Sequence, residues 1–309
     1  MIVHLIDGTY ELFRHFYGLR RAKNGDPPFG AVRGLLHMVL QMFETGATHL
    51  GVATDHVIES FRNRLWYGYK TGAGIEPALL AQFHPLEEAL TAMGVVVWPM
   101  VELEADDALA SAAALAARDT DVEKVCIWTP DKDLAQCVVD GRVVQVDRKS
   151  GKVRDAEGVR QKFGVAPESI PDYLALVGDA ADGYPGLPGF GAKSAAALLS
   201  RFGHIEAIPA DGTQWRGVLA SGRLAAVRNE SLQAAVAPNA KGHDLRRPDL
   251  IDVELCEDGP RGTVRPAIED DVFAWHRILE TGLWRLERHE LLLDRVEVSP
   301  RRRNGQRKQ

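Results

Sequence analysis

The chain has 309 residues, of which 45% are hydrophobic and 26% are charged, and these are the proportions of an ordinary globular protein. No apolar run reaches the roughly 18 residues that a membrane span needs, and the N-terminus lacks the basic and apolar regions of a signal peptide. The three cysteines have neither CxxC nor zinc-ligand spacing. We therefore expect a reduced, cytoplasmic protein of one large or two modest domains.

Residues 1–155 alternate apolar strand patterns with amphipathic helical patterns, which is typical of an α/β fold with a mostly parallel sheet flanked by helices. The stretch at 56–76 mixes basic and aromatic residues and contains Gly72 and Gly74, and we interpret it as a mobile segment. Helices are predicted over 9–20, over 30–44, over 77–93 with a break near Pro85, and over 104–118. Strands are predicted at 1–7, 49–54, 95–98, 125–129 and 142–147.

From about residue 156 the pattern changes to helices and loops, so we expect a separate helical portion over 156–295. Within it, a Gly/Pro-rich hairpin joins two predicted helices over about 172–203, and an irregular or strand segment is predicted at 250–256. The tail at 296–309 is basic and is predicted to be disordered.

Three carboxylates crowd the start of one predicted helix, at Glu104, Asp106 and Asp107. Acids in a first helical turn gain about 0.3–1 kcal/mol each from the helix dipole, which accounts well for one of them. Three are harder to explain, because like charges at close range raise each other's pKa. A divalent cation would remove that repulsion, and Mg²⁺ takes carboxylate ligands together with water and substrate phosphate.

Further acids follow the predicted strands, and Asp179 and Asp182 follow an apolar helix. An aspartate on its own after a strand is usually a turn or helix-cap residue. Ligands bind at the carboxyl ends of the strands in an open α/β sheet, so side chains that follow several strands are expected to converge there. The candidate metal ligands are Asp7, Asp55, Glu104, Asp106, Asp107, Asp131, Asp133, Asp179 and Asp182.

The net charge of −6 does not exclude nucleic acid as a partner. When the nine candidate ligands are left out, 34 acids remain against 37 bases. Bound cations would hide the nine charges from a phosphodiester backbone, so the charge balance neither supports nor excludes DNA.

The glycine-rich stretch at 186–194 allows two interpretations besides a purely structural turn. A phosphate-binding P-loop needs Gly-Lys-Ser after its second glycine, whereas Ala192 here separates Gly191 from Lys193, and a loop rather than a strand precedes the motif. A helix–hairpin–helix fits better, because backbone N–H groups at a helix N-terminus can hold a DNA phosphate without reading bases. We therefore expect no nucleotide cofactor.

A second basic group lies at 60–70, between Asp55 and a pair of glycines. Arg62 offers bidentate contact to a phosphate, Lys70 offers a point charge, and Tyr69 offers a face on which an unpaired base can stack. Each of these residues is individually more often a surface or packing residue, but beside a carboxylate cluster the two cations become candidates to stabilise a transition state.

Taken together and in this order, the motifs resemble those of bacterial 5′–3′ exonucleases, the flap endonucleases related to the amino-terminal domain of DNA polymerase I. The resemblance covers about residues 1–205 and extends loosely to about 290. It is carried by Asp7-Gly8-Thr9 with Arg14, Asp55 with Ser60-Phe61-Arg62, Tyr69-Lys70, Glu104-Ala105-Asp106-Asp107, Asp131-Lys132-Asp133-Leu134, Gly178-Asp179-Ala180-Ala181-Asp182 and Pro185 to Ser194.

The resemblance implies a PIN-like 5′ nuclease fold with an arch at about 56–92. It also implies a monomeric stand-alone enzyme that hydrolyses DNA bearing a 5′ end or a 5′ flap. The nine acids would hold two or more Mg²⁺ or Mn²⁺ ions, and such ions, roughly 3.5–4 Å apart, can activate water and stabilise a leaving oxygen. By the same resemblance Lys70 and Arg62 would hold the scissile phosphate, Arg14 would contact the strand and Tyr69 would stack on a base. The hairpin, with K⁺ as an expected ion, would grip the duplex through Gly189, Gly191, Lys193 and Ser194.

Two departures from the family pattern leave alternatives open. Gly183 stands where the family commonly has an asparagine, and no Lys or Arg occurs from 71 through 117, where the family's arch usually carries several. The poor arch favours a DNA-junction binding protein with little catalysis as the alternative, whereas the complete acidic set argues for an enzyme. A metal-dependent ribonuclease on a similar sheet is the third possibility.

Overall fold

The computed structural model describes residues 1–21, 27–209 and 212–215. The segment expected at 250–256 and the tail at 296–309 lie outside these residues. Within them, no helix is long and apolar enough to cross a bilayer.

A six-stranded sheet forms the centre of the first part of the chain, with the strand order β3-β2-β1-β4-β5-β6. Neighbouring strands from β3 to β5 are parallel, and only β6 runs antiparallel to its neighbour. Their bounds are β1 Ile2–Asp7, β2 His49–Asp55, β3 Val96–Met100, β4 Lys124–Trp128, β5 Val143–Asp147 and β6 Lys152–Arg154. This confirms the mostly parallel sheet that the sequence predicts.

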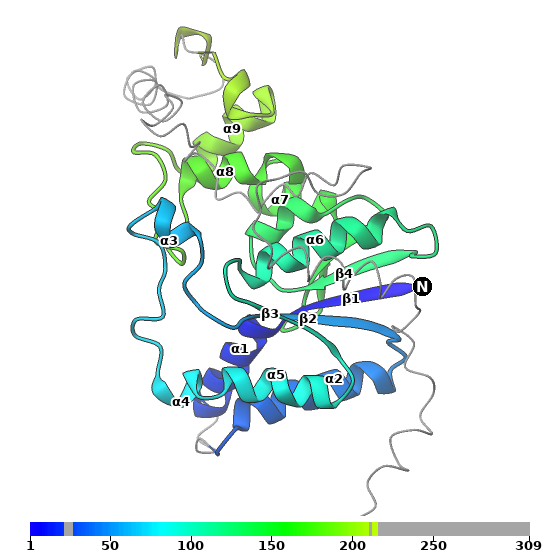
Figure 1. The fold of residues 1–309 in the computed structure, drawn as a ribbon. Coiled ribbons are helices and arrows are strands. Elements are labelled where there is room, and N and C mark those ends of the chain that lie inside the picture. The colour runs from blue at the N-terminus through cyan, green and yellow to red at the C-terminus, as the bar shows by residue number, and fades with distance from the viewer. Residues whose placement is uncertain (22–26, 210–211, 216–309) are drawn as a thin grey trace, which may run out of the picture.

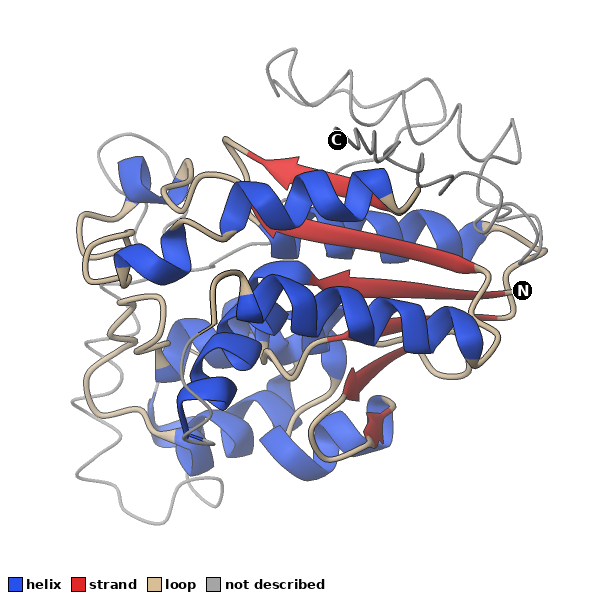
Figure 2. Cartoon of the chain, turned by 90° about the horizontal axis from the view of Figure 1, so that it is seen from below, coloured by secondary structure: helices blue, strands red, loops and turns tan. Residues whose placement is uncertain are grey.

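Helices cover both faces of the sheet (Figures 1 and 2). On one face pack α1, α2 and α5, and on the other packs α6. The helices are α1 Gly8–Arg21, α2 Gly30–Glu44, α3 Arg62–Leu65, α4 Pro77–Leu80, α5 Phe83–Ala92, α6 Ala105–Arg118, α7 Ala156–Phe163, α8 Ile170–Val177 and α9 Ala192–Phe202. Short 3-10 turns lie at Asp133–Cys137, Pro167–Ser169, Ile205–Ala207 and Gly212–Trp215.

The central strands are buried on both sides because their side chains alternate between two cores. Leu5 and Ile127 point toward α6, where Leu109 is fully buried among alanines of the helix. Ile6 and Val52 belong to the opposite core, formed with α1, α2 and α5. The alanine-rich sequence of α6 gives it a high intrinsic helix propensity and lets it lie close to the sheet.

The helical part from α7 onward has its own apolar core, which includes Leu174, Leu198 and Trp215. Asp155 caps α7 by accepting a hydrogen bond from the Gly158 N–H at 2.8 Å. The hairpin of the sequence analysis connects α8 to α9, so the predicted helix–hairpin–helix is present.

Three details differ from the elements that the sequence predicts. The short helix α3 lies within 56–76, where no helix was expected. The short strand β6 was not expected, because Lys152–Arg154 is an exposed edge with little apolar pattern. The helix over 77–93 is interrupted at 81–82 instead of near Pro85. Pro85 lies in the first turn of α5, where no backbone N–H is needed. At the interruption, the side-chain amide oxygen of Gln82 accepts hydrogen bonds from the N–H groups of Ala31 and Val32 in the first turn of α2.

The parallel strands all end at the same edge of the sheet, on the left in Figure 1. The register places Asp7 of β1 beside Ala53 of β2, and Asp55 of β2 beside Met100 of β3. α6 begins at this edge directly after β3, so its first turn faces the ends of β1 and β2. The fold therefore brings the carboxylates that follow separate strands to one place.

We expect the variant Leu109→Ala to lower the free energy of unfolding by about 2–5 kcal/mol, because it leaves a cavity in the core between α6 and the sheet. Urea unfolding followed by circular dichroism measures the change. The matched control is Leu80→Ala on α4, where the leucine is 49% exposed and the loss should stay below about 0.5 kcal/mol. Equal losses in the two variants would contradict this assignment of the core.

Candidate metal centre

Backbone and hydroxyl donors fix the acids at the ends of β1 and β2. Asp7 accepts hydrogen bonds from the Tyr10 N–H at 2.8 Å and from the Thr129 hydroxyl at 3.1 Å. Asp55 accepts one from the Ala105 N–H, in the first turn of α6, at 2.8 Å. The end of β2 is thereby tied directly to the start of the helix that carries the other acids.

Asp107 joins the start of α6 to the segment at 60–70. Its two carboxylate oxygens accept hydrogen bonds from Arg62 Nη1 and Nη2, both at 2.8 Å, in the planar bidentate geometry that favours arginine. The same carboxylate accepts the Glu104 N–H at 2.9 Å, so it also caps the helix. Burial opposes the charge on Arg62, but Asp107 outweighs it and holds the pKa of the guanidinium above its usual range.

Glu104 binds two hydroxyl groups and a lysine through its carboxylate. Its oxygens accept from the Ser60 hydroxyl at 2.6 Å and from the Tyr69 hydroxyl at 3.1 Å, and Lys70 Nζ lies 2.9 Å away. Burial favours the neutral form of this side chain, but Lys70 and Arg62 outweigh that effect and lower the pKa of Glu104. Glu104 is therefore ionised and already neutralised by protein cations.

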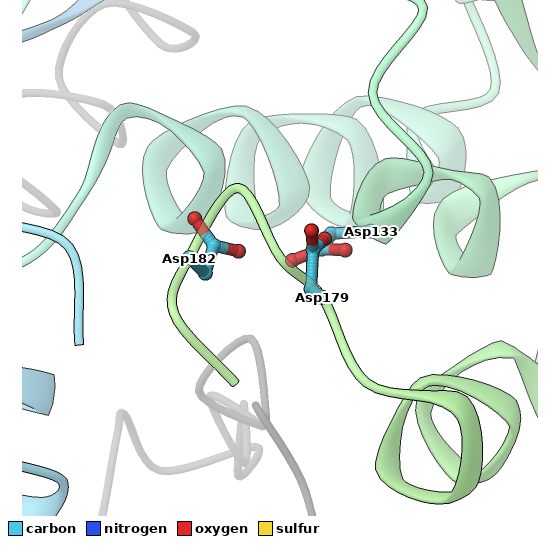
Figure 3. A group of neighbouring side chains, drawn as sticks. All are labelled: Asp133, Asp179 and Asp182. Carbon is cyan, nitrogen blue, oxygen red and sulfur yellow. The ribbon is translucent and has the colours of Figure 1, made fainter. Parts of the chain in front are cut away.

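Asp133, Asp179 and Asp182 form a second group, in which one carboxylate oxygen of each lies within 4.8 Å of the others. Figure 3 shows Asp133 and Asp179 adjacent, with Asp182 on the same loop as Asp179. Lys132 Nζ lies 2.7 Å from Asp179, and Lys70 Nζ lies 3.0 Å from Asp182. Asp133 Oδ1 is buried and has no hydrogen-bond partner, although a buried carboxylate oxygen normally has one.

Burial raises the pKa of several of the acids, and neighbouring carboxylates add to this effect. The pKa of Asp7 is raised to about 7, mainly by burial and further by Asp55 and Asp131. The pKa values of Asp106 and Asp133 lie well above the usual range for the same reasons, and that of Asp55 is also raised. Asp131 lies at the exposed rim beside them. The buried carboxyl groups of Asp7, Asp55, Asp106 and Asp133 are therefore costly to ionise.

These observations are those of a site that fits hard cations. The donors are carboxylate oxygens, which Mg²⁺ and similar ions prefer. The orphaned oxygen of Asp133 and the raised pKa values of Asp7 and Asp106 indicate that positive charge is lacking here. All nine acids that the sequence predicts lie in this region, and they form two classes. Those with a close cationic partner are Glu104, Asp107, Asp179 and Asp182. Those for which no ion pair is present among the described contacts are Asp7, Asp55, Asp106, Asp131 and Asp133.

The loop that carries Asp179 and Asp182 closes through two glycines in contact. Gly178 and Gly186 both have positive φ angles, and a Cβ on Gly178 would lie 2.6 Å from the Gly186 nitrogen. The close approach lets Asp179 and Tyr184 exchange backbone hydrogen bonds at 2.8 Å. The loop leads directly into the hairpin, because the Leu187 N–H bonds back to Leu176 O of α8.

The segment at 60–70 packs against the same loop. The Lys70 N–H donates to Asp182 O at 3.0 Å, and the Trp66 indole N–H donates to Gly183 O at 3.1 Å. Gly183 has a φ of 72°, and a Cβ there would lie 1.9 Å from Gly68 O. Asparagine tolerates such a φ, but its Cβ would collide with the Gly68 carbonyl, so glycine fits this position.

The predicted DNA-contacting residues lie in different surroundings. Arg14 on α1 donates from Nε to Glu11 at 2.7 Å. Tyr69 is only 8% exposed and is held by Glu104, so its ring faces the protein in this structure. In the hairpin, Lys193 is exposed in the first turn of α9, Ser194 accepts a hydrogen bond from the Gly191 N–H at 3.0 Å, and Gly189 and Gly191 are exposed.

Sequence reasoning missed the roles of several residues that shape the site. Lys132 pairs with Asp179, and the Ser60 hydroxyl bonds to Glu104. The Thr9 hydroxyl accepts the Asp55 N–H, and the Thr129 hydroxyl bonds to Asp7. For the two threonines the available signal was their position, because Thr9 and Thr129 each lie two residues from an acid, Asp7 and Asp131, where a strand ends.

We expect Asp7→Asn to stabilise the metal-free protein at pH 8.5. The folded protein holds the proton of Asp7 up to about pH 7, whereas the unfolded chain loses it near the ordinary value of 3.8. Asp7 therefore destabilises the fold progressively between these values, and fully above pH 7. The amide should restore about 1–4 kcal/mol at pH 8.5 and progressively less toward pH 4. Urea unfolding in EDTA measures this, and a less stable variant at pH 8.5 would contradict it.

We expect Gly183→Asn to displace the segment at 60–70, because the new Cβ meets the Gly68 carbonyl. The free energy of unfolding should fall by about 1–3 kcal/mol, and limited proteolysis should cut faster within 60–70. Gly141→Asn is the matched control, since Gly141 has a φ of 73° and a Cβ there would have nothing within 4 Å. The same loss in both variants would show that backbone conformation, not the contact, matters.

Comparison with known proteins agrees with this arrangement. Residues 2–164 match the family model of the 5′-3′ exonuclease N-terminal resolvase-like domain, and residues 165–238 match that of the 5′-3′ exonuclease C-terminal SAM fold. The described structure is similar to a bacteriophage T5 flap endonuclease solved with DNA and metal ions, with a TM-score of 0.56 and 20% identity over 80% of this chain and 95% of that one. At this identity the likeness concerns the fold.

Other relatives are more similar in sequence. The chain is 38% identical to DNA polymerase I of Pseudomonas aeruginosa over 203 residues, which are 64% of this chain but only 22% of that protein. It is 31% identical to the 5′-3′ exonuclease of Buchnera aphidicola from Acyrthosiphon pisum over 210 residues, 67% of this chain and 72% of that one. Together with the acidic site, these matches show that the chain belongs to the 5′–3′ exonuclease family.

Proposed function

We propose that this 5′ nuclease binds two or more divalent cations, Mg²⁺ or Mn²⁺, in the acidic site and hydrolyses phosphodiesters in DNA that carries a 5′ end or a 5′ flap. The observation that carries the proposal is the set of nine carboxylates gathered at one sheet edge, five of them without an ion pair among the described contacts. Bound at this site, the ions would activate a water molecule and stabilise the leaving oxygen.

The acids fall into two groups that would hold the ions. Asp7, Asp55, Asp106 and Asp131 lie around the ends of β1, β2 and β4 and the start of α6. Asp133, Asp179 and Asp182 form the second group. Glu104 and Asp107 complete the proposed ligand set. In this structure their oxygens pair with Lys70 and Arg62, respectively. They would therefore bind an ion through a bridging water molecule, or directly after these pairs separate.

Lys70 is well placed to contact the scissile phosphate, because Nζ bridges Glu104 at 2.9 Å and Asp182 at 3.0 Å and so lies between the two groups. Burial opposes the charge on Lys70, but these acids hold its pKa above the usual range, and the ammonium remains charged at any pH of interest. Arg62 supports it from the same segment. Both residues would stabilise negative charge that develops on the phosphate.

The duplex would lie across the hairpin between α8 and α9. Gly189 and Gly191 let the backbone approach a phosphate, Lys193 adds a positive charge, and Ser194 fixes the turn. This hairpin would also hold a K⁺ ion. Arg14 would contact the strand nearer to the site, and Tyr69 would stack on a base if it leaves Glu104.

The remaining attributes of the enzyme belong to the same proposal. We propose that the protein is a cytoplasmic monomer. We also propose that it needs no nucleotide cofactor, because Ala192 interrupts the P-loop-like sequence at 186–194 and no strand precedes that sequence. The arch would extend over about 56–92, and the boundary between the nuclease core and the helical portion would lie near residue 155.

The test is cleavage of a 5′-labelled DNA flap. We expect the wild-type protein to cut it in Mg²⁺ or Mn²⁺ and to lose activity in EDTA. Asp131→Ala and Asp133→Ala should each reduce the rate by about 100-fold or more, because each removes a proposed ligand. Asp140→Ala removes an exposed aspartate outside the site and should cut at the wild-type rate. Wild-type rates in both site variants would refute their assignment.

The lack of Lys and Arg from 71 through 117 motivates a competing hypothesis, namely a DNA-junction binding protein with little catalysis. It predicts that flap binding persists with no product, even in Mn²⁺. Parallel binding and cleavage assays on the same flap separate the two, and a matched RNA flap tests the ribonuclease alternative.

A further inference from the structure

Two histidines stack next to the acidic site, and nothing proposed so far uses them. The His56 and His84 rings are nearly parallel, with 4.2 Å between their centroids and 6° between their planes. His56 follows Asp55 at the end of β2, and His84 lies in the first turn of α5. His84 is exposed, and the His56 side chain is 35% exposed.

A buried carboxylate holds the stack in place. Glu87, one turn after His84 on α5, is only 7% exposed and accepts hydrogen bonds from the Thr54 hydroxyl and from His56 Nδ1, both at 2.7 Å. The orientation of His56 is thereby fixed from the protein interior, and His84 lies on its face. Such a stack is ordered before any ligand arrives, which lowers the entropic cost of binding a flat partner.

The chemistry of the pair points to a flat ligand and not to a metal ion. Within the part of the chain that the structure describes, the group of acids, cysteines and histidines that converge on a possible ion is Asp133, Asp179 and Asp182, and the histidine pair is outside it. Because the two rings are parallel, their nitrogens do not point toward a common ion, whereas a ring face is suited to stacking on a flat ligand. Nucleobases stack on aromatic side chains, including histidine, with little dependence on sequence.

The position of the pair identifies which part of the substrate it would meet. β2 places Asp55 in the metal site and His56 immediately beyond it, at the same sheet edge. The stretch from 71 through 117, which carries His84, has no Lys or Arg of its own, so it offers a DNA strand no cationic side chain for its phosphates. Stacking on bases can hold a single strand without them.

We propose that the His56–His84 stack is a platform for an unpaired base of the 5′ strand of the DNA substrate, with the base stacking on His84. This inference rests on the proposed nuclease function. His84 is then a substrate-binding residue, while His56 and Glu87 position it.

The experiment is a binding cycle that changes the protein and the DNA in turn. Binding of a fluorescent 5′ flap is measured by anisotropy with Ca²⁺ in place of Mg²⁺, and gel analysis verifies that the DNA stays intact. The protein variants are His84→Ala, His84→Phe, which keeps an aromatic face, and His37→Ala, which removes an exposed histidine on α2 outside the stack. In the DNA, single abasic nucleotides are placed in turn along the 5′ strand.

We expect His84→Ala to weaken binding about tenfold, and His84→Phe and His37→Ala to bind within about twofold of the wild type. One abasic position should weaken wild-type binding by a similar factor and have no further effect on His84→Ala. If every abasic position weakens wild type and His84→Ala equally, or if His84→Ala binds as the wild type does, the proposal is wrong. Metal-dependent cleavage by the wild-type protein tests the nuclease function separately, so the two can fail independently.

Discussion

Mutual repulsion among carboxylates at one edge of the sheet is the constraint on which the rest of the site depends. A parallel sheet brings the ends of β1, β2 and β4 together, and α6 starts at the same place. The fold therefore concentrates negative charge in a region where water is scarce, and the raised pKa values of Asp7, Asp106 and Asp133 are the direct result. Such an arrangement costs stability unless cations compensate it.

The protein supplies part of that compensation itself. Arg62 and Lys70, on the segment at 60–70, pair with Asp107, Glu104 and Asp182, and Lys132 pairs with Asp179. The acids that remain without such partners, around Asp7 and Asp106, are those for which an external cation has most to offer. The same residues that a sequence motif assigns to substrate binding thus also hold the site together.

Much of the fold follows from the sequence, because periodic apolar patterns determine the central strands and the longer helices. The convergence of the acids was also predictable, since the carboxyl ends of parallel strands lie at one edge. The pairing of Lys70 with both Glu104 and Asp182, and the capping of α2 by Gln82, depend on contacts between distant segments and leave no local pattern. The exclusion of a side chain at position 183 likewise depends on a contact with Gly68, which lies more than 100 residues earlier in the chain.

The paired glycines at 178 and 186 have a consequence for how the two halves of the enzyme work together. Their contact couples the loop that carries Asp179 and Asp182 rigidly to the hairpin that follows it. If duplex DNA binds to the hairpin as proposed, any tilt of the hairpin on binding or release would displace these two aspartates. Engagement of the duplex and assembly of the cutting centre would then be one mechanical event.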